Sequence, residues 1–251
     1  YRLFGKKVFL MAQGVGPLNR KFSRWITGRI VSLCNGISVR DQASKDLLVE
    51  VGVSEDKIRL SADLSYYRSE FLRSDIMEGI ESKPSKYAKD LEGNDIIPVE
   101  GTVGLSLRRA TMTSTTESSL KYFLQSIDRP FVFLNLHHCQ DHDEIKKMAG
   151  LQQRVMNVLD MNKLFQTPLA TLPTISCVVG MRYHACVWAS LHHIPFVALA
   201  YDEKVKHLAE DLGQPYIDMT QKNVTTEDLE AIFKKVVDER EDYRTALESR
   251  V

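Results

Sequence analysis

The sequence lacks a net charge, a signal peptide and any long apolar run. Its 251 residues carry 33 lysines and arginines against 33 aspartates and glutamates. This balance excludes the broad basic surface typical of nucleic-acid-binding proteins, so we expect no nucleic-acid partner and only local anion sites. No stretch of about 18 apolar residues is present, so the sequence predicts no membrane-spanning helix. We find no secretory leader either.

Cysteine is also scarce. The four cysteines are Cys34, Cys139, Cys177 and Cys186. None of them forms a C-x-x-C pair, and several lie in apolar runs. This usage is typical of reduced, buried thiols in an intracellular protein and argues against a disulfide framework.

What the sequence does contain is a regular alternation of apolar strands and amphipathic helices. Alternating strands and helices are typical of α/β folds in which helices cover both faces of a parallel sheet. Asp41, Asp202 and the pair Thr225 and Asp228 are expected to cap helices. The predicted strands occupy residues 8–13, 36–41, 58–66, 102–110, 131–136, 174–179 and 196–200, and predicted helices include residues 18–33, 43–51 and 225–238.

A polar segment at residues 73–100 interrupts this alternation. It is rich in Ser, Lys, Glu, Asp and Gly, which is typical of a domain boundary. We therefore expect two Rossmann-like domains, at residues 1–95 and 96–224, with a final helix at 225–251 that crosses back to the first domain. Because the chain starts at Tyr1 and enters a buried-looking strand almost at once, we expect the first domain to be truncated.

Polar residues follow the predicted strands at the ends where ligands of parallel sheets bind. Four of them are cations in a chain with no net charge, which favours a site for a phosphate or carboxylate. Taken singly, each cation could instead be a solvated charge or a partner of a helix cap. The strand-end candidates are Gln13, Gly14, Gly16, Arg40, Asp63, Arg108, Arg182, His184, Tyr201 and Lys204.

The turn from Gly180 to His184 joins a buried strand to a helix. A helix N-terminus attracts anions, and a histidine placed there can carry a proton near neutral pH. A histidine that bonds a neighbouring carbonyl is the alternative for His184. Lys204 follows the next strand, twenty residues after His184, so the Lys204 and His184 side chains could meet over one ligand if the two strands pair.

Three other motifs carry weaker signals. The loop at Gln13–Gly16 offers backbone N–H groups to a phosphate but matches neither G-x-G-x-x-G nor a P-loop. The segment HHCQDHDE at 137–144 has no metal-ligand spacing, so we expect a strand-end loop there and no metal. His192 and His193 close a helix, where positive charge suits the helix dipole, and we assign them no chemistry.

Five motifs, in order along nearly the whole chain, resemble those of the polysaccharide pyruvyl transferases. The most specific are G-M-R-x-H and the later P-x-V-x-L-x-Y-D-x-K-V. The matches are Gln13–Leu18 for Q-G-x-G-P-L, Ser38–Asp41 for S-x-R-D, Gly104–Arg108 for G-x-S-x-R, Gly180–His184 and Pro195–Val205.

The resemblance implies a two-domain GT-B fold and transfer of pyruvate from phosphoenolpyruvate to a sugar, as a ketal. It implies that His184 is the general acid and base, that Arg40 and Lys204 hold the donor's phosphate and carboxylate, and that Arg182 binds ligand. It implies no cofactor beyond the donor substrate. The implied acceptor is a surface glycan or its lipid-linked precursor, which places the protein in the cytoplasm at the inner membrane surface.

The chain departs from the family at two points and leaves two other functions open. It lacks the early G-x-x-N-x-G-D loop, and Tyr183 replaces a frequent leucine. One alternative is a GT-B glycosyltransferase that uses a nucleotide sugar, although Glu203 and Glu210 are poorly placed to bind a ribose. The other is a non-catalytic module that binds phosphoenolpyruvate or a glycan. The acceptor sugar and the oligomeric state are not encoded in any motif that we identify.

Overall fold

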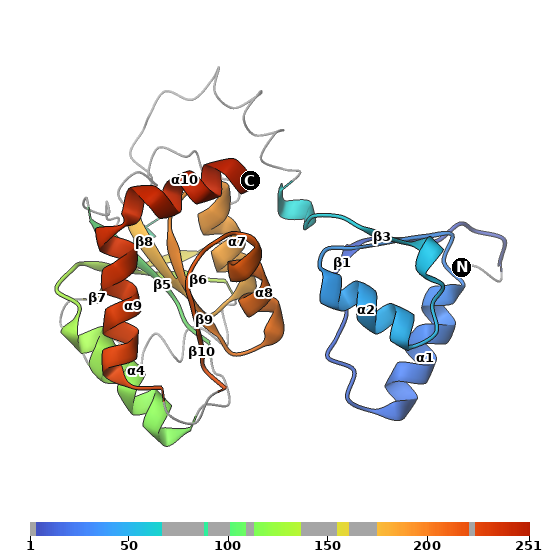
Figure 1. The fold of residues 1–251 in the computed structure, drawn as a ribbon, viewed down its shortest axis with the longest axis horizontal. Helices are drawn as coiled ribbons and strands as arrows, with labels where there is room; N and C mark the ends of the chain where they lie inside the picture. The colour runs from blue at the N-terminus through green and yellow to red at the C-terminus, as the bar shows by residue number, and fades with distance from the viewer. Residues whose placement is uncertain are drawn as a thin grey trace, which may run out of the picture. The chain divides into compact units, whose positions relative to one another are not determined.

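The computed structural model describes residues 4–66, 88–89, 101–108, 113–136, 155–160, 175–220 and 224–251. The chain forms two compact units, Tyr1–Arg73 and Ser74–Val251 (Figure 1). Each unit has its own sheet, which confirms the predicted α/β class with two parallel-sheet domains. A domain boundary at residue 95 and a terminal helix that crosses to the first domain stay predictions.

The first unit contains a three-stranded parallel sheet in the order β1-β2-β3. Its core joins Ile37 and Val39 of β2 to Leu48 of α2 and Val31 of α1. The elements are β1 (Phe9–Gln13), α1 (Lys21–Ser32), β2 (Gly36–Val39), α2 (Gln42–Glu50), a short 3₁₀ helix (Glu55–Lys57) and β3 (Ile58–Leu60).

In the first unit only one face of the sheet is covered by the described residues. Because the strands follow one another across the sheet in a single direction, right-handed crossovers place both helices on the same side, as Figure 1 shows. Phe9, Met11 and Leu60 are more than half exposed. The expectation of a sheet covered on both faces is therefore wrong for this part of the chain.

The second unit contains a seven-stranded sheet in the order β10-β9-β8-β5-β6-β7-β4. All neighbouring strands are parallel except β4, which pairs antiparallel with β7 at one edge. The strands are β4 (Ala88–Lys89), β5 (Thr102–Ser106), β6 (Phe131–Asn135), β7 (Val155–Asp160), β8 (Ile175–Gly180), β9 (Phe196–Ala200) and β10 (Tyr216–Asp218).

Helices cover both faces of this larger sheet. α4 (Ser114–Ser126) and α9 (Thr226–Asp238) pack together on one face, and α7 (Tyr183–Leu191) and α8 (Glu203–Asp211) pack together on the other (Figure 1). α10 (Arg240–Arg250) continues from α9. Among the described residues, no helix combines the length and apolarity needed to cross a membrane.

The structure confirms the predicted helix caps. Asp41 accepts a hydrogen bond from the Ser44 N–H at 2.7 Å, and Asp202 accepts one from the Val205 N–H at 3.1 Å. Thr225 and Asp228 form a capping box at the start of α9. These caps fix where the helices begin after the strand ends, which is where the candidate site residues lie.

Helix α7 ends on a half-buried histidine whose environment favours the neutral ring, contrary to the sequence expectation of positive charge there. The His192 ring packs against Trp188 with their centroids 5.0 Å apart. Burial, with a smaller contribution from His193, lowers the pKa of His192 to about 4. An unfolded histidine titrates near 6.5, so the unfolded chain binds the extra proton first as the pH falls.

We therefore predict that the protein loses stability as the pH falls from about 6.5 to about 4. The contribution of His192 is complete above pH 6.5, and its loss amounts to roughly 3 kcal/mol at pH 4. Urea unfolding at a series of pH values measures this slope. His192→Phe keeps the ring contact with Trp188 and should flatten the slope in this window. His207→Phe, at a partly exposed histidine on α8, is the control and should leave the slope unchanged. An unchanged slope in His192→Phe contradicts the prediction.

Candidate active site

The second sheet has a topological switch point between β5 and β8. The chain adds β6 and β7 on one side of β5, then returns to place β8, β9 and β10 on the other side. The helices that follow β5 and β8 lie on opposite faces, so the two connecting loops diverge at the carboxyl ends of these strands. In open α/β sheets, ligands bind at such a divergence.

Arg108 and Tyr201 meet across this switch point. Arg108 follows β5 and Tyr201 follows β9, while β8 lies between those two strands. The Arg108 Nη1 donates a hydrogen bond to the Tyr201 hydroxyl at 2.6 Å. The Arg108 guanidinium carbon also lies 4.4 Å from the centroid of the Tyr201 ring. The pair thus bridges the carboxyl end of β8, where the turn Gly180–His184 begins.

The contacts of Tyr201 keep its phenol protonated. Burial and the neighbouring Asp202 carboxylate raise the pKa of Tyr201, and the Arg108 guanidinium opposes this rise. A neutral phenol can still donate a hydrogen bond. The neutral Tyr201 hydroxyl therefore orients the Arg108 guanidinium without supplying an opposite charge.

The turn Gly180–His184 is held tightly against the sheet. The Met181 N–H donates to the Ser106 carbonyl at 2.7 Å, which extends the pairing of β8 with β5. A side chain at Gly180 would place its Cβ 2.7 Å from the Cys186 Sγ, so only glycine lets α7 pack this close to the strand. This packing fixes the position at which α7 begins.

The first turn of α7 carries the two residues that the sequence singled out. Arg182 is the N-cap residue of α7, and His184 is the second residue of the helix. The His184 side chain is exposed, and its ring packs edge-on against Tyr183 with the centroids 5.4 Å apart. The positive end of the helix dipole lies at this turn, so the site favours anions.

Lys204 lies at the start of the next helix. β8 and β9 are adjacent and parallel, with Val179 opposite Val197, so the strands that precede His184 and Lys204 do pair. A meeting of the two side chains over one ligand stays a prediction. Asp202 caps α8, and Lys204 is the second residue of that helix. Arg108, Arg182 and Lys204 therefore supply three cations at one edge of one sheet.

Ser106 is a site residue that the sequence reasoning did not select. It is fully buried at the carboxyl end of β5, opposite Gly180. Its hydroxyl has no hydrogen-bond partner among the described residues. A buried polar group of this kind is expected to find a partner in a ligand or water. The signal was present in the G-x-S-x-R motif, where Ser106 precedes Arg108 by two residues.

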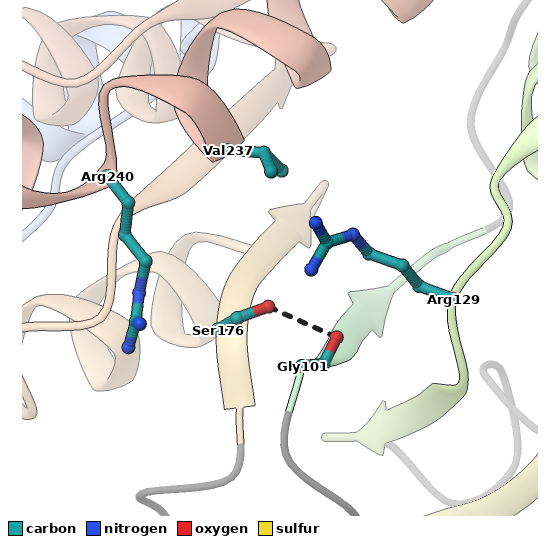
Figure 2. Close-up of a pocket in the computed structure, with 5 residues that line it drawn as sticks. All are labelled: Gly101, Arg129, Ser176, Val237 and Arg240. Atoms are coloured by element: carbon teal, nitrogen blue, oxygen red, sulfur yellow. Dashed lines mark hydrogen bonds between the residues drawn. The ribbon is translucent and has the colours of Figure 1, made fainter.

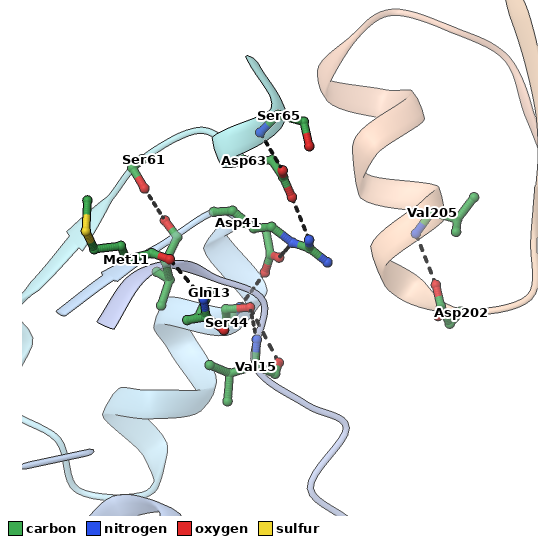
Figure 3. A network of polar contacts seen from close by, with 12 residues as sticks. Met11, Gln13, Val15, Asp41, Ser44, Ser61, Asp63, Ser65, Asp202 and Val205 are labelled. Atoms are coloured by element: carbon green, nitrogen blue, oxygen red, sulfur yellow. Dashed lines mark hydrogen bonds and ion pairs between the residues drawn. The ribbon is translucent and has the colours of Figure 1, made fainter. Parts of the chain in front are cut away.

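In the first unit, the strand-end residues pair with one another (Figure 3). The Arg40 Nη1 donates to the Asp63 Oδ2 at 2.6 Å, and both side chains are largely buried. Burial alone would raise the pKa of Asp63, but hydrogen bonds from Ser65 and the Arg40 guanidinium lower it below its usual value. Asp63 is thus the ionised counterion that orients Arg40.

Glycine at position 14 makes room for Arg40. A Cβ at Gly14 would lie 2.7 Å from the Arg40 Nε, so the guanidinium stacks directly on the loop after β1. Gly16 adopts a φ of +105°, which favours glycine. The Gln13 amide donates back to the Met11 carbonyl at 3.0 Å, and the Val15 N–H donates to the Ser44 hydroxyl at 2.8 Å.

The predicted residues therefore form two groups, one on each unit. Arg108, Arg182, His184, Tyr201 and Lys204 follow β5, β8 and β9 of the second sheet, whereas Gln13, Gly14, Gly16, Arg40 and Asp63 follow β1, β2 and β3 of the first. Convergence of all four cations on one ligand stays a prediction. The described ranges hold no group of three or more potential metal ligands. Arg109, Cys139 and the segment 137–144 lie outside those ranges.

Comparison with known protein families assigns the chain to one family. The family model for polysaccharide pyruvyl transferases matches residues 1–203. The chain belongs to this family. The matched region contains the first four motifs in full. It contains the fifth motif up to Glu203, so Lys204 and Val205 lie just beyond it. Among curated proteins, no sequence matches the chain.

Solved structures of two epimerases and a galactosyltransferase share the fold. UDP-GlcNAc 2-epimerase from Neisseria meningitidis has a TM-score of 0.58 at 14% identity over 98% of this chain. The 2-epimerase from Methanocaldococcus jannaschii has a TM-score of 0.56 at 12% identity over 94%. The lipopolysaccharide outer core galactosyltransferase WaaB has a TM-score of 0.51 at 9% identity over 92%. The chain spans 65%, 64% and 60% of these three proteins. These likenesses confirm a GT-B-like α/β fold.

Proposed function

We propose that this pyruvyl transferase family member transfers pyruvate from phosphoenolpyruvate to a sugar of a surface polysaccharide, or to its lipid-linked precursor. The observation that carries the proposal is the switch point of the second sheet, where His184 and Arg182 at the start of α7 share the carboxyl edge of the sheet with Arg108 and Lys204. Phosphoenolpyruvate carries a phosphate and a carboxylate on three carbons. A donor of that kind needs several cations and a group that moves protons.

The reaction balances with one proton carrier. Two sugar hydroxyls add to C2 of phosphoenolpyruvate, a proton is delivered to the C3 methylene, and the C2–O bond to phosphate breaks. The products are a cyclic pyruvate ketal and inorganic phosphate. The proton of the second hydroxyl leaves with the phosphate. In this proposal, His184 takes a proton from the attacking hydroxyl and delivers a proton to C3.

In this proposal, each cation binds a different anionic part of the donor or presents a different kind of contact to it. Arg108 and Arg182 present planar guanidinium groups that match a phosphate or carboxylate in bidentate fashion, and Lys204 adds a point charge. Tyr201 orients Arg108 through the 2.6 Å hydrogen bond. On the first unit, Arg40, oriented by Asp63, is the proposed substrate-binding cation. Gln13, Gly14 and Gly16 of the loop after β1 are proposed to bind substrate on that unit as well.

The proposed partners follow from this chemistry. The donor is phosphoenolpyruvate, the acceptor is a glycan or a lipid-linked sugar, and no further cofactor takes part. Cytoplasmic placement, with peripheral association at the inner membrane surface through a lipid-linked acceptor, accounts for access to both substrates. A nucleotide sugar is the competing donor, because the N. meningitidis epimerase of similar fold is bound to UDP-GlcNAc.

Product analysis separates the possible donors. Purified protein is incubated with phosphoenolpyruvate or with UDP-sugars, each with a panel of hexose and amino-sugar acceptors, and phosphate and UDP are measured. Acceptor-dependent phosphate release, with a ketal seen by mass spectrometry, supports the proposal. UDP release instead shows a glycosyltransferase. Phosphoenolpyruvate binding without release under any acceptor shows a binding module.

A further inference from the structure

A pocket of about 420 Å³ lies at the end of the second sheet opposite the candidate active site. Gly101 directly precedes β5, Ser176 is the second residue of β8, and Arg129 comes just before β6, so the amino ends of three strands line it. Val237 and Arg240, at the junction of α9 and α10, complete the lining (Figure 2). The candidate site residues of this unit follow the carboxyl ends of β5, β8 and β9.

Two arginines without ion-pair partners face this pocket. Among the described residues, neither Arg129 nor Arg240 forms an ion pair or a hydrogen bond, and the Arg240 Nε is buried without a partner. Other arginines of the chain do have partners, as Arg40 has in Asp63 and Arg244 has in Glu248. The described residues that line the pocket include two guanidinium groups and no carboxylate, so this lining attracts anions.

The positive charges of Arg129 and Arg240 both reach Cys177, which lies next to Ser176 of the pocket. Burial raises the pKa of the Cys177 thiol, next to Ser176, to about 12, while Arg129 and Arg240 both oppose that rise. In Figure 2 the Arg129 and Arg240 side chains flank the Ser176 side chain from opposite sides. Two planar groups on either side of one cavity can each donate two hydrogen bonds to a single dianion.

The remaining lining residues fix the shape of the pocket. The Ser176 hydroxyl donates to the Gly101 carbonyl at 3.2 Å and lies 3.3 Å from the Thr102 carbonyl, which ties the starts of β5 and β8 together. Val237 supplies an apolar wall. A volume of 420 Å³ falls in the range of small-molecule sites and leaves room for a carbon skeleton beside an anionic group.

We propose that this pocket binds a small phosphate monoester, with its phosphate held between Arg129 and Arg240 and its carbon skeleton against Val237. Such a ligand links the loop before β6 to the first residue of α10, and so fastens the C-terminal helix pair to the sheet. The proposal does not depend on the pyruvyl transfer reaction, because the pocket and the candidate active site lie at opposite ends of the strands.

Calorimetric titration with glycerol 3-phosphate tests this proposal, with inorganic phosphate and uncharged glycerol as comparison probes. We expect wild-type protein to bind glycerol 3-phosphate at millimolar or lower concentration, more tightly than inorganic phosphate, and not to bind glycerol. Arg129→Gln and Arg240→Gln should each weaken binding at least tenfold. Arg244→Gln removes the same charge from the exposed side of α10 and should bind as wild type does.

Two further variants make the result decisive. Arg182→Gln weakens phosphate binding at the candidate active site only, so it should retain the binding that Arg129→Gln loses. Val237→Phe fills the pocket while both arginines stay in place, and it should also abolish binding, which covers the case in which an arginine variant does not fold. The proposal is overturned if wild-type protein does not bind glycerol 3-phosphate, or if Arg240→Gln and Val237→Phe bind it as wild type does.

Discussion

Replacement of His184 by alanine is expected to lower kcat for pyruvyl transfer by about 10² to 10⁴-fold. The side chain is exposed in the first turn of α7, so its loss removes proton transfer without opening a cavity. The KM for phosphoenolpyruvate should change much less than kcat, because the cations at Arg108, Arg182 and Lys204 remain. Steady-state phosphate release at saturating acceptor measures both constants.

His207→Ala is the matched control for this variant. His207 is a partly exposed histidine on α8, where its Nε2 lies 3.5 Å from the Glu203 carboxylate. It lies outside the turn that carries the proposed chemistry, so its replacement should leave kcat unchanged. Both variants should unfold within about 0.5 kcal/mol of wild type, as surface substitutions usually do. If His184→Ala retains more than a tenth of the wild-type kcat, another group carries the proton.

Gly180→Ala is expected to cost about 2 kcal/mol of stability and to reduce activity at least tenfold. The new Cβ would lie 2.7 Å from the Cys186 Sγ, and Cys186 is completely buried, so its side chain has no room to turn away. The relief of this clash must move the start of α7, and His184 moves with it. Trp188, buried on the same helix, reports the displacement by fluorescence during urea unfolding.

A double-mutant cycle shows whether the contact with Cys186 is the cause. Cys186→Ala removes the sulfur atom and should cost about 1 kcal/mol alone. In the double variant Gly180→Ala, Cys186→Ala, the clash is absent, so the two costs should not add: we expect a coupling of at least 1 kcal/mol and partial recovery of activity. Additive losses would show that the sulfur does not limit the approach of α7.

Much of the second unit could be predicted from the sequence, because its elements carry strong local signals. The runs at β8 and β9 are continuous and apolar, as expected for strands buried on both faces, and both are fully buried. The caps at Asp202 and Thr225 have the residue types that start helices. Each of these features depends on a few neighbouring residues, so sequence spacing was sufficient.

Several elements could not be predicted, because tertiary contacts decide them. β10 has three half-buried residues and no alternation, and it pairs only because Ala198 and Leu199 lie opposite it. The predicted final helix at 225–251 did not show the separation into α9 and α10 at Glu239, because α10 has a single buried residue, Leu247, in a mostly polar sequence. The predicted strand from 58 to 66 is shorter, as β3 ends at Leu60, and α1 begins at Lys21 instead of residue 18.

The candidate site shows the same division. The residue types at the strand ends were predicted, and five of them follow β5, β8 and β9 at one edge of the second sheet. The order of the strands was not predictable, since it depends on which strands pair across the sheet. The pairing of Arg40 with Asp63 was also missed, because the two residues are separated by 23 positions and no local pattern joins them.

The contact between Arg108 and Tyr201 links residues that lie 93 positions apart in the chain. Closing so long a loop is slow, and contacts of this range form late in folding. The anion site can therefore exist only after β8 and β9 have joined β5, so during synthesis it must wait until the chain beyond Tyr201 has emerged. Folding intermediates with only the strands from β5 to β7 in place would bind no donor at this edge.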